Sequence, residues 1–83
     1  MTRLFIIKDG SVMPDIPCGE VSVKSYPTNA GLIWFGIDST AIENRGYPLD
    51  VGLEKIVKIW NMNQLSFFFE NSTDTVALLC EIL

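Results

Sequence analysis

The fold of this chain is indicated most clearly by the stretch Asn29-Ala-Gly-Leu-Ile-Trp-Phe-Gly-Ile-Asp-Ser-Thr-Ala-Ile-Glu-Asn-Arg-Gly-Tyr-Pro-Leu-Asp50. It contains an apolar run at residues 32–37, a polar loop at 38–46 and a short return segment at 47–50. A short apolar run bounded by turn residues is typical of a buried strand. Pro48 keeps the return segment at a sheet edge or in an extended loop, because proline has no N–H to donate. The stretch therefore predicts two strands joined by a loop.

Further strands are predicted on both sides of this stretch. Apolar runs and alternation, separated by turn residues, predict strands at residues 4–8, 20–26, 64–70 and 75–83. In the last of these, Leu78 and Leu79 break the alternation, so we expect that strand to be buried on both faces or to carry a bulge. About seven short strands predict an all-β fold, a small antiparallel β-sandwich or a jelly-roll-like barrel, as one domain over residues 1–83.

Residues 53–60 fit two kinds of secondary structure. Leu53, Ile56, Val57 and Trp60 would line one face of a helix that Asp50 could cap. Three β-branched residues within the segment, and the turn that follows it, favour a strand instead. We expect a strand here, with the helix as the alternative.

The composition argues against several classes of function. Six basic and ten acidic residues give a net charge of −4, and no basic cluster occurs, so nucleic-acid binding is not expected. No apolar run approaches the roughly 20 residues that span a bilayer, and residues 1–7 do not form a secretory leader. We therefore expect a soluble protein made in a cytoplasm. An apolar content of 48% on so short a chain suggests that some apolar surface is buried against a partner.

No residue pattern points to catalysis, a metal or a cofactor. The chain has no histidine, which removes the commonest general base and metal ligand and excludes Ser–His–Asp and Cys–His arrangements within one chain. A calcium site from Asp38, Glu43 and Asp50 is conceivable because these acids flank one loop, but the spacing of an EF-hand is absent. We expect no enzyme activity, no cofactor and no metal site.

The two cysteines, Cys18 and Cys80, lie far apart in the sequence. Two buried free thiols are expected, because cytosolic chains stay reduced. A disulfide between them would require the N-terminal and C-terminal strands to be neighbours.

The aromatic residues suggest where a partner would bind. They are more numerous than a core of this size comfortably encloses, and buried aromatic side chains dominate the energy of protein interfaces. In extended segments, Phe68 and one of Trp34 or Phe35 point away from the best core residues of their strands. The candidate interface residues are therefore Trp34, Phe35, Trp60 and Phe68, with acidic residues at the rim.

Three motifs resemble a pattern found in small virion proteins of tailed bacteriophages. They are the Asn-Ala-Gly segment before a strand that ends at Gly36, the Gly-x-Pro-Leu-x-x-Gly segment at 46–52, and the Asn-x-Asn-x-Leu turn at 61–65 that enters an aromatic strand. The similarity covers roughly residues 21–83 and consists of turn and core positions. Such proteins are β-sandwich or jelly-roll modules that decorate or cement capsids, or form parts of head and tail fibres, often as trimers.

The resemblance implies a non-enzymatic structural protein of the virion that decorates or cements the capsid. Its partner would be the major capsid protein or another virion protein, and the chain itself would form an oligomer, with a trimer favoured. A first alternative is a tail or fibre adaptor or carbohydrate-binding module, in which Tyr47 near Asp38 or Asp50 would stack on sugar rings. A second alternative is a small regulatory protein that binds a host factor.

Overall fold

Seven strands make up most of the chain in a computed structural model, which describes residues 2–38, 40–42 and 45–82. A 3-10 turn, η1 (Met62–Gln64), precedes the sixth strand. Over the described ranges, no helix is long and apolar enough to cross a membrane. The strands are β1 (Thr2–Lys8), β2 (Cys18–Ser25), β3 (Ile33–Ile37), β4 (Tyr47–Leu49), β5 (Glu54–Lys58), β6 (Leu65–Phe69) and β7 (Thr75–Ile82).

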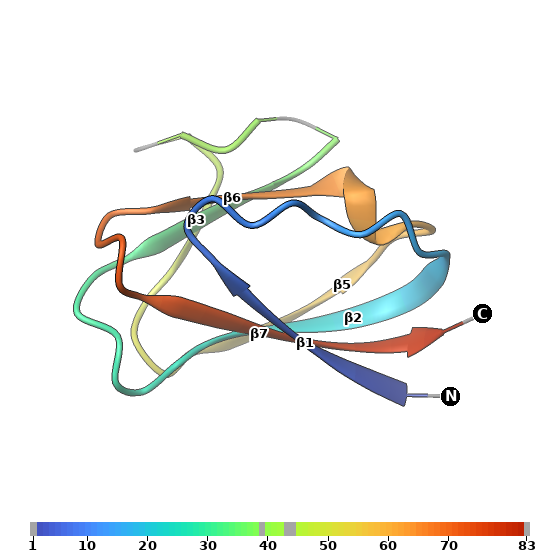
Figure 1. Ribbon diagram of the computed structural model, residues 1–83, viewed down its shortest axis with the longest axis horizontal. Coiled ribbons are helices and arrows are strands. Elements are labelled where there is room, and N and C mark those ends of the chain that lie inside the picture. Colours follow the sequence, from blue (N-terminus) through green and yellow to red (C-terminus); the bar gives the residue numbers. More distant parts are fainter. Residues whose placement is uncertain (1, 39, 43–44, 83) are drawn as a thin grey trace.

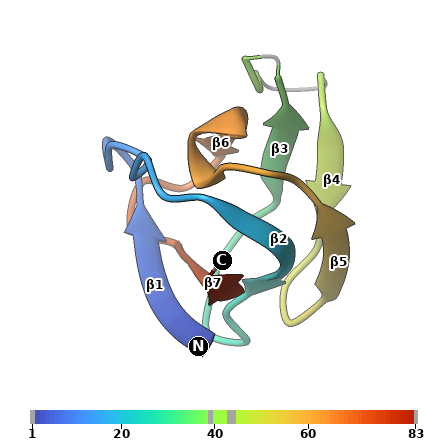
Figure 2. The same cartoon turned by 90° about the vertical axis from the view of Figure 1, so that its right-hand side faces the viewer.

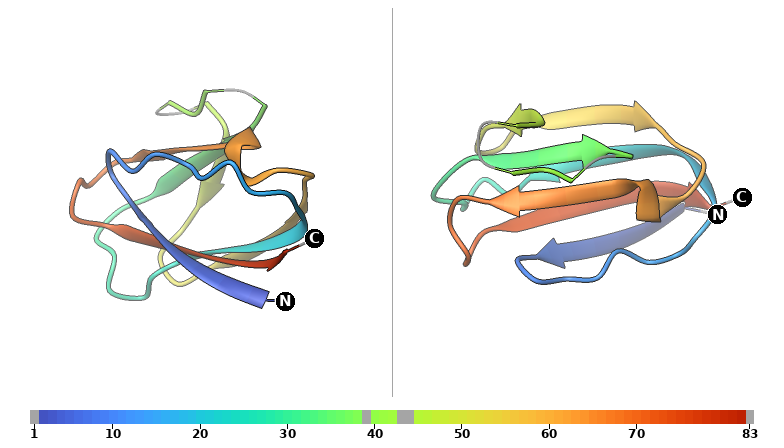
Figure 3. Two further views of the ribbon diagram at one scale, coloured as in Figure 1. Left: turned by 45° about the vertical axis from the view of Figure 1, so that its right-hand side comes forward. Right: turned by 90° about the horizontal axis from the view of Figure 1, so that it is seen from above.

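The strands form two antiparallel sheets that lie face to face (Figure 1). One sheet has the order β1-β7-β2-β5 and the other has the order β4-β3-β6. Figure 2 shows the two layers from the end of the sandwich, with β5 and β4 on one side and β1 on the other. The view from above in Figure 3 shows the strands of both layers running along the longest dimension of the molecule. The all-β sandwich predicted from the sequence is confirmed.

The core lies between the two sheets. Successive side chains of a strand point to opposite faces, so burial alternates along most strands. In β2, Val21 and Val23 are fully buried, and in β7, Val76 and Leu78 are fully buried. The segment at 53–60 contains β5, so the strand is confirmed and the helical alternative is excluded.

The expectation for Leu78 and Leu79 is wrong. Leu78 is fully buried, whereas Leu79 is 48% exposed on the outer face of its sheet, and β7 pairs with β1 in unbroken register. The ordinary alternation of a half-buried strand therefore continues, with an apolar residue at an outward position. The register shift lies in the neighbouring strand, between Cys18 and Val21.

The Asn-Ala-Gly motif joins the connection between β2 and β3 to the turn between β6 and β7. The Asn29 side chain donates to the Thr75 carbonyl at 2.8 Å and accepts from the Thr75 N–H at 2.9 Å. The buried carboxylate of Asp74 accepts from the N–H groups of Ala30 and Gly31 at 2.8 and 2.9 Å. These bonds satisfy backbone groups of both connections, so this motif has a structural role.

The Asn-x-Asn-x-Leu motif is also structural, because it caps η1. The Asn61 side chain accepts from the N–H of Asn63, and Gln64 completes a capping box by accepting from the N–H of Asn61 at 3.0 Å. The amide of Gln64 donates to Asp38 at 2.9 Å, which links η1 to the end of β3. This contact holds Asp38 in a left-handed conformation with φ of 57°.

Candidate interaction surfaces

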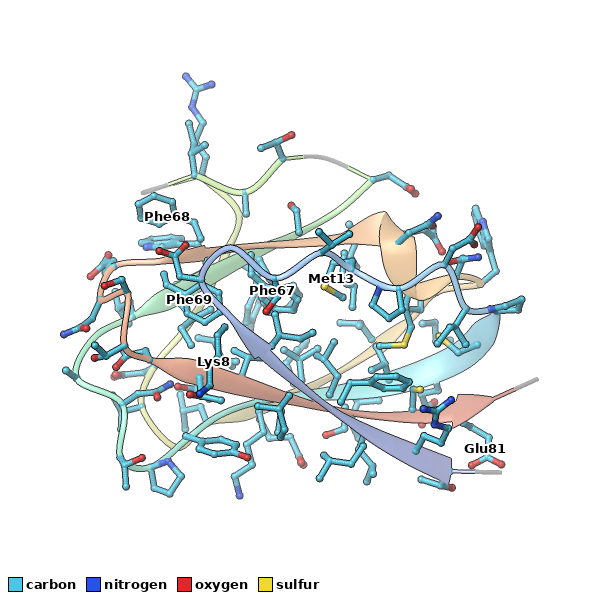
Figure 4. All side chains as sticks on the ribbon, viewed as in Figure 1. Lys8, Met13, Phe67, Phe68, Phe69 and Glu81 are labelled. Carbon is cyan, nitrogen blue, oxygen red and sulfur yellow. The ribbon has the colours of Figure 1, made fainter. Side chains whose placement is uncertain are left out.

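The outer face of the three-stranded sheet carries a row of apolar residues formed by Pro48, Trp34 and Phe68. Trp34 is the cross-strand partner of Pro48 on one side and of Phe68 on the other. The indole N–H of Trp34 donates to Glu70 at 2.8 Å, which fixes the orientation of the ring. Figure 4 shows Phe68 pointing away from the core, while Phe67 and Phe69 point towards the other sheet. Both Trp34 and Phe68 are half-buried, so each ring keeps an accessible part.

The chain itself covers one end of this outer face. We refer to the whole outer face of the three-stranded sheet as the covered face. The loop after β3 folds back so that Ala41 is buried and its N–H donates to Ser66 Oγ at 2.8 Å. Gly36, the cross-strand partner of Ser66, is buried at the same end of the sheet. Gly46 has φ of +126°, and a Cβ there would lie 2.8 Å from the carbonyl oxygen of Phe35. The loop therefore needs glycine at position 46 to approach the sheet closely.

The structure brings together only two of the four candidate interface residues. Trp34 and Phe68 are cross-strand partners on the covered face. Phe35 must be removed from the set, because it is 3% exposed and packs in the core against Phe67 and Tyr47. Trp60 is 73% exposed and lies in the connection between β5 and η1. Phe35 and Trp34 are adjacent in one strand, so only one of them can point outward.

The residues of the sugar-binding alternative lie along different parts of the three-stranded sheet. Tyr47 is opposite Phe35, Asp38 follows the C-terminal end of β3, and Asp50 follows Leu49, which pairs with the first residue of β3. Asp38 and Asp50 thus lie beyond opposite ends of β3 and are separated by roughly 20 Å. The ring of Tyr47 is in contact with Phe35 and has the ammonium group of Lys55 5.3 Å from its centre. The sugar site stays a prediction.

The calcium alternative involves two of the same acids. Its third residue, Glu43, lies outside the described residues. In the part of the chain that the structure describes, no three His, Cys, Asp or Glu side chains are grouped in a way that could hold a metal ion.

A second apolar surface, which the sequence analysis did not identify, lies on the outer face of the four-stranded sheet. We refer to it as the open face. Four of its aliphatic residues are between 43% and 59% exposed: Leu4, Ile6, Ile56 and Leu79. They come from β1, β5 and β7, which belong to one sheet only in the folded chain. The sequence signal for this surface is the broken alternation at Leu79, which marks an outward apolar residue rather than burial on both faces.

Charged side chains surround the apolar centre of the open face. Glu20 pairs across strands with Lys58, and Lys24 pairs with Glu54. Glu81 accepts a hydrogen bond from Thr2 at 2.6 Å, which lowers the pKa of the Glu81 carboxyl. A shallow hollow of about 260 Å³ lies between Thr2, Glu20, Ile56 and Leu79. The open face thus has an apolar middle and charged ends.

A smaller pocket of about 190 Å³ lies between β6 and the connection after β1. It is lined by Lys8, Met13, Phe67 and Phe69, among others, which Figure 4 labels. Sites for small molecules usually have volumes of roughly 300–1,000 Å³. This pocket is therefore too small to enclose a typical cofactor.

The two cysteines are buried, free and close to each other, since β2 and β7 are neighbouring strands. The expected free, buried thiols are confirmed. Burial is the main cause that raises the pKa of both thiols, and in Cys18 the neighbouring Cys80 raises it further. The Cys80 thiol lies 3.7 Å from the sulfur of Met62. Buried thiols with raised pKa values are poor nucleophiles.

The comparisons with known proteins add no family to this description. The chain matches no model of a protein family, no curated protein and no solved structure. The function therefore has to be argued from the surfaces themselves.

Proposed function

We propose that this protein is a non-enzymatic structural protein of a tailed bacteriophage virion, which attaches to the capsid through the covered face. The observation that carries the proposal is the outward-facing pair of Trp34 and Phe68, held on adjacent strands with Pro48 beside it. The resemblance of the turn motifs to small virion proteins supplies the biological setting. The partner would be the major capsid protein or another protein of the shell.

The physical argument rests on the rigidity of this aromatic pair. Strand pairing fixes both backbones, and the bond to Glu70 fixes the Trp34 ring, so docking would order few additional groups. Aromatic side chains presented in this way provide large contact areas and often dominate binding energies. Glu70 and the other acidic residues of the chain would favour a basic partner surface.

Cosedimentation with capsids tests the proposal. Heads of the phage that encodes the chain, freed of accessory proteins, are mixed with the recombinant protein, and the bound fraction is measured against concentration. We expect saturable binding, and we expect Trp34→Ala or Phe68→Ala to weaken it by roughly tenfold or more. Each variant is first shown by circular dichroism to be folded.

Val12→Ala is the matched control, because Val12 is an apolar residue that is 91% exposed in the connection after β1. It should bind like the parent protein. Absence of the chain from intact particles, or equal binding by all variants, would contradict the proposal. Binding to purified tails but not to heads would favour the adaptor alternative.

A further inference from the structure

The open face is organised as three parallel rows that cross the strands. Its middle row is apolar except for one serine. Leu4 pairs with Leu79, Leu79 pairs with Ser22, and Ser22 pairs with Ile56. No described segment of the chain crosses this face, as the views in Figures 1 and 2 show.

The two rows beside the middle row carry charges in opposite order. In the first row, Glu20 is opposite Lys58, and in the third row, Lys24 is opposite Glu54. On β2 the acid Glu20 is in the first row and the base Lys24 is in the third. On β5 the positions are exchanged, with Lys58 in the first row and Glu54 in the third, because the two strands are antiparallel. All four residues point outward, because they are exposed and alternate with inward-facing residues of the core.

We propose that the open face binds a second copy of this chain, related by a twofold axis that runs along the middle row. Rotation by 180° about this axis exchanges the first and third rows. It places Lys24 of each copy over Glu20 of the other, and Glu54 over Lys58. Four ion pairs then form where β2 and β5 of the two copies meet, beside a centre where Leu4, Leu79 and Ile56 meet the same residues of the second copy.

The charge pattern selects this occupant. If the twofold axis ran parallel to the strands instead, the strand order of the second copy would be reversed, and Glu20 of each copy would lie over β7 of the other, in the row that carries Glu81. That contact brings acidic side chains together, which is unfavourable. The axis along the middle row places Glu20 over Lys24 instead. Sheets that pack face to face usually keep their strand directions within about 30°, so the rows can face each other over most of their length.

The open face is large enough for a reversible contact. Its four strands have up to eight residues each, so the face measures roughly 26 × 19 Å, or about 500 Å². Two such faces together bury about 1,000 Å², which is the lower limit for a specific interface. This association is independent of the proposed function, because it uses the opposite sheet.

Sedimentation equilibrium gives the first test. The chain has a mass of 9.3 kDa, and we expect a reversible species of twice this mass at higher concentration. Leu79→Asp should weaken the association by roughly a hundredfold, because it places two carboxylates at the apolar centre. Leu53→Asp is the matched control, since Leu53 is 56% exposed and precedes β5 rather than lying in a row of the open face.

Charge reversal gives the second test and identifies the arrangement. Glu20→Lys should weaken self-association by roughly tenfold, because the introduced lysine would then face Lys24 of the other copy, and Lys24→Glu should do the same by bringing two acids together. An equimolar mixture of the two variants should recover dimers at the parent concentration, since each lysine pair then faces a glutamate pair. Circular dichroism verifies that both variants are folded.

Three outcomes would overturn the inference. The first is a monomer at all concentrations, and the second is a trimer, which the resemblance favours but which a twofold contact cannot form. The third is a dimer whose affinity is unchanged by the three substitutions. That result would point to pairing through the exposed edge of β1 instead. None of these outcomes depends on whether the protein binds capsids.

Discussion

The outer faces of the two sheets both have apolar centres, but they differ in what lies over them. The covered face is partly protected by the loop after β3, which is fixed by the bond between Ala41 and Ser66 and by the close approach at Gly46. The open face has no such cover in the described structure, and its leucine and isoleucine side chains are about half exposed. The loop therefore protects one end of the covered face and leaves Trp34 and Phe68 partly accessible, whereas the open face is accessible over its whole length.

This difference predicts where substitutions act. Changes on the covered face and in the loop over it should lower the free energy of unfolding, because they disturb contacts within the chain. Changes at the centre of the open face should alter association and leave the folded monomer nearly intact. Four measurements of stability, made at concentrations where the chain is monomeric, test this division.

Outside the core, the largest effect is expected for Gly46→Ala. A Cβ at this position would lie 2.8 Å from the Phe35 carbonyl oxygen, at a φ of +126° that favours glycine, so the loop would have to shift. We expect the free energy of unfolding to fall by about 2–4 kcal/mol, measured by urea denaturation.

Gly10→Ala is the control for this substitution. Gly10 also has a positive φ, +84°, but no atom lies within 4 Å of a Cβ placed there. Its loss should be limited to about 1 kcal/mol of backbone strain. Equal losses in the free energy of unfolding for the two variants would show that the close contact between Gly46 and the sheet is not what makes glycine necessary there.

The next effect is expected for Trp34→Ala on the covered face. The variant removes a half-buried indole and its bond to Glu70, so the free energy of unfolding should fall by about 1–2 kcal/mol. Trp60→Ala, which removes a ring that is 73% exposed, should change it by less than about 0.5 kcal/mol. Thermal unfolding followed by circular dichroism compares the two; a larger loss for Trp60→Ala would reverse this assignment.

A smaller effect is expected in the pH dependence of stability, because two buried thiols lie on the inner side of the four-stranded sheet. Burial raises the pKa of Cys18 and Cys80 above 9.0, so the folded state retains protons that the unfolded state releases. Their contribution to stability is therefore complete below about pH 9 and is lost as the pH rises through the folded-state pKa values. The slope for one thiol cannot exceed about 1.4 kcal/mol per pH unit.

Urea midpoints at pH 8 and pH 10.5 measure this dependence. The double variant Cys18→Ala and Cys80→Ala should lose less stability over this interval than the parent protein. Both proteins share the same lysines and tyrosines, so titration of those groups is common to the comparison. Parallel losses in the two proteins would show that the thiols are not responsible.

The smallest effect is expected for Leu79→Ala on the open face. Because Leu79 is 48% exposed, the monomer should lose less than about 1 kcal/mol. Its neighbour Leu78 is fully buried, and Leu78→Ala should lower the free energy of unfolding by about 2–5 kcal/mol. Denaturation of the two variants in dilute solution compares adjacent leucines on opposite faces of one strand. Similar losses in the free energy of unfolding would mean that Leu79 stabilises the monomer as much as a core residue does.

Local patterns were sufficient to predict most of the strands. Apolar runs, alternation and turn residues act within a few positions of each other, so they predicted the all-β class and favoured a strand at residues 53–60. The motif residues Asn29 and Gly31 were recognised as turn positions, but their partner Asp74 was not identified. That partner lies more than 40 residues away in the sequence.

The candidate surfaces were only partly predictable. Adjacent residues of a strand point to opposite faces, so the sequence restricted the outward aromatic residue of β3 to Trp34 or Phe35 but did not choose between them. The choice depends on which face of β3 meets the other sheet, and that is a property of the packed sandwich. The same packing places Phe35 in the core and leaves Trp34 beside Phe68.

The sequence by itself therefore determined the strand content, the turns and the absence of histidine chemistry. Only the tertiary structure decided that β1, β7, β2 and β5 are neighbours, which places Leu4, Leu79 and Ile56 in one row between oppositely ordered charges. The physical reason is that turn and strand preferences act locally, whereas strand order follows from burying the inner faces of both sheets together. A row that crosses strands has no counterpart in the linear sequence.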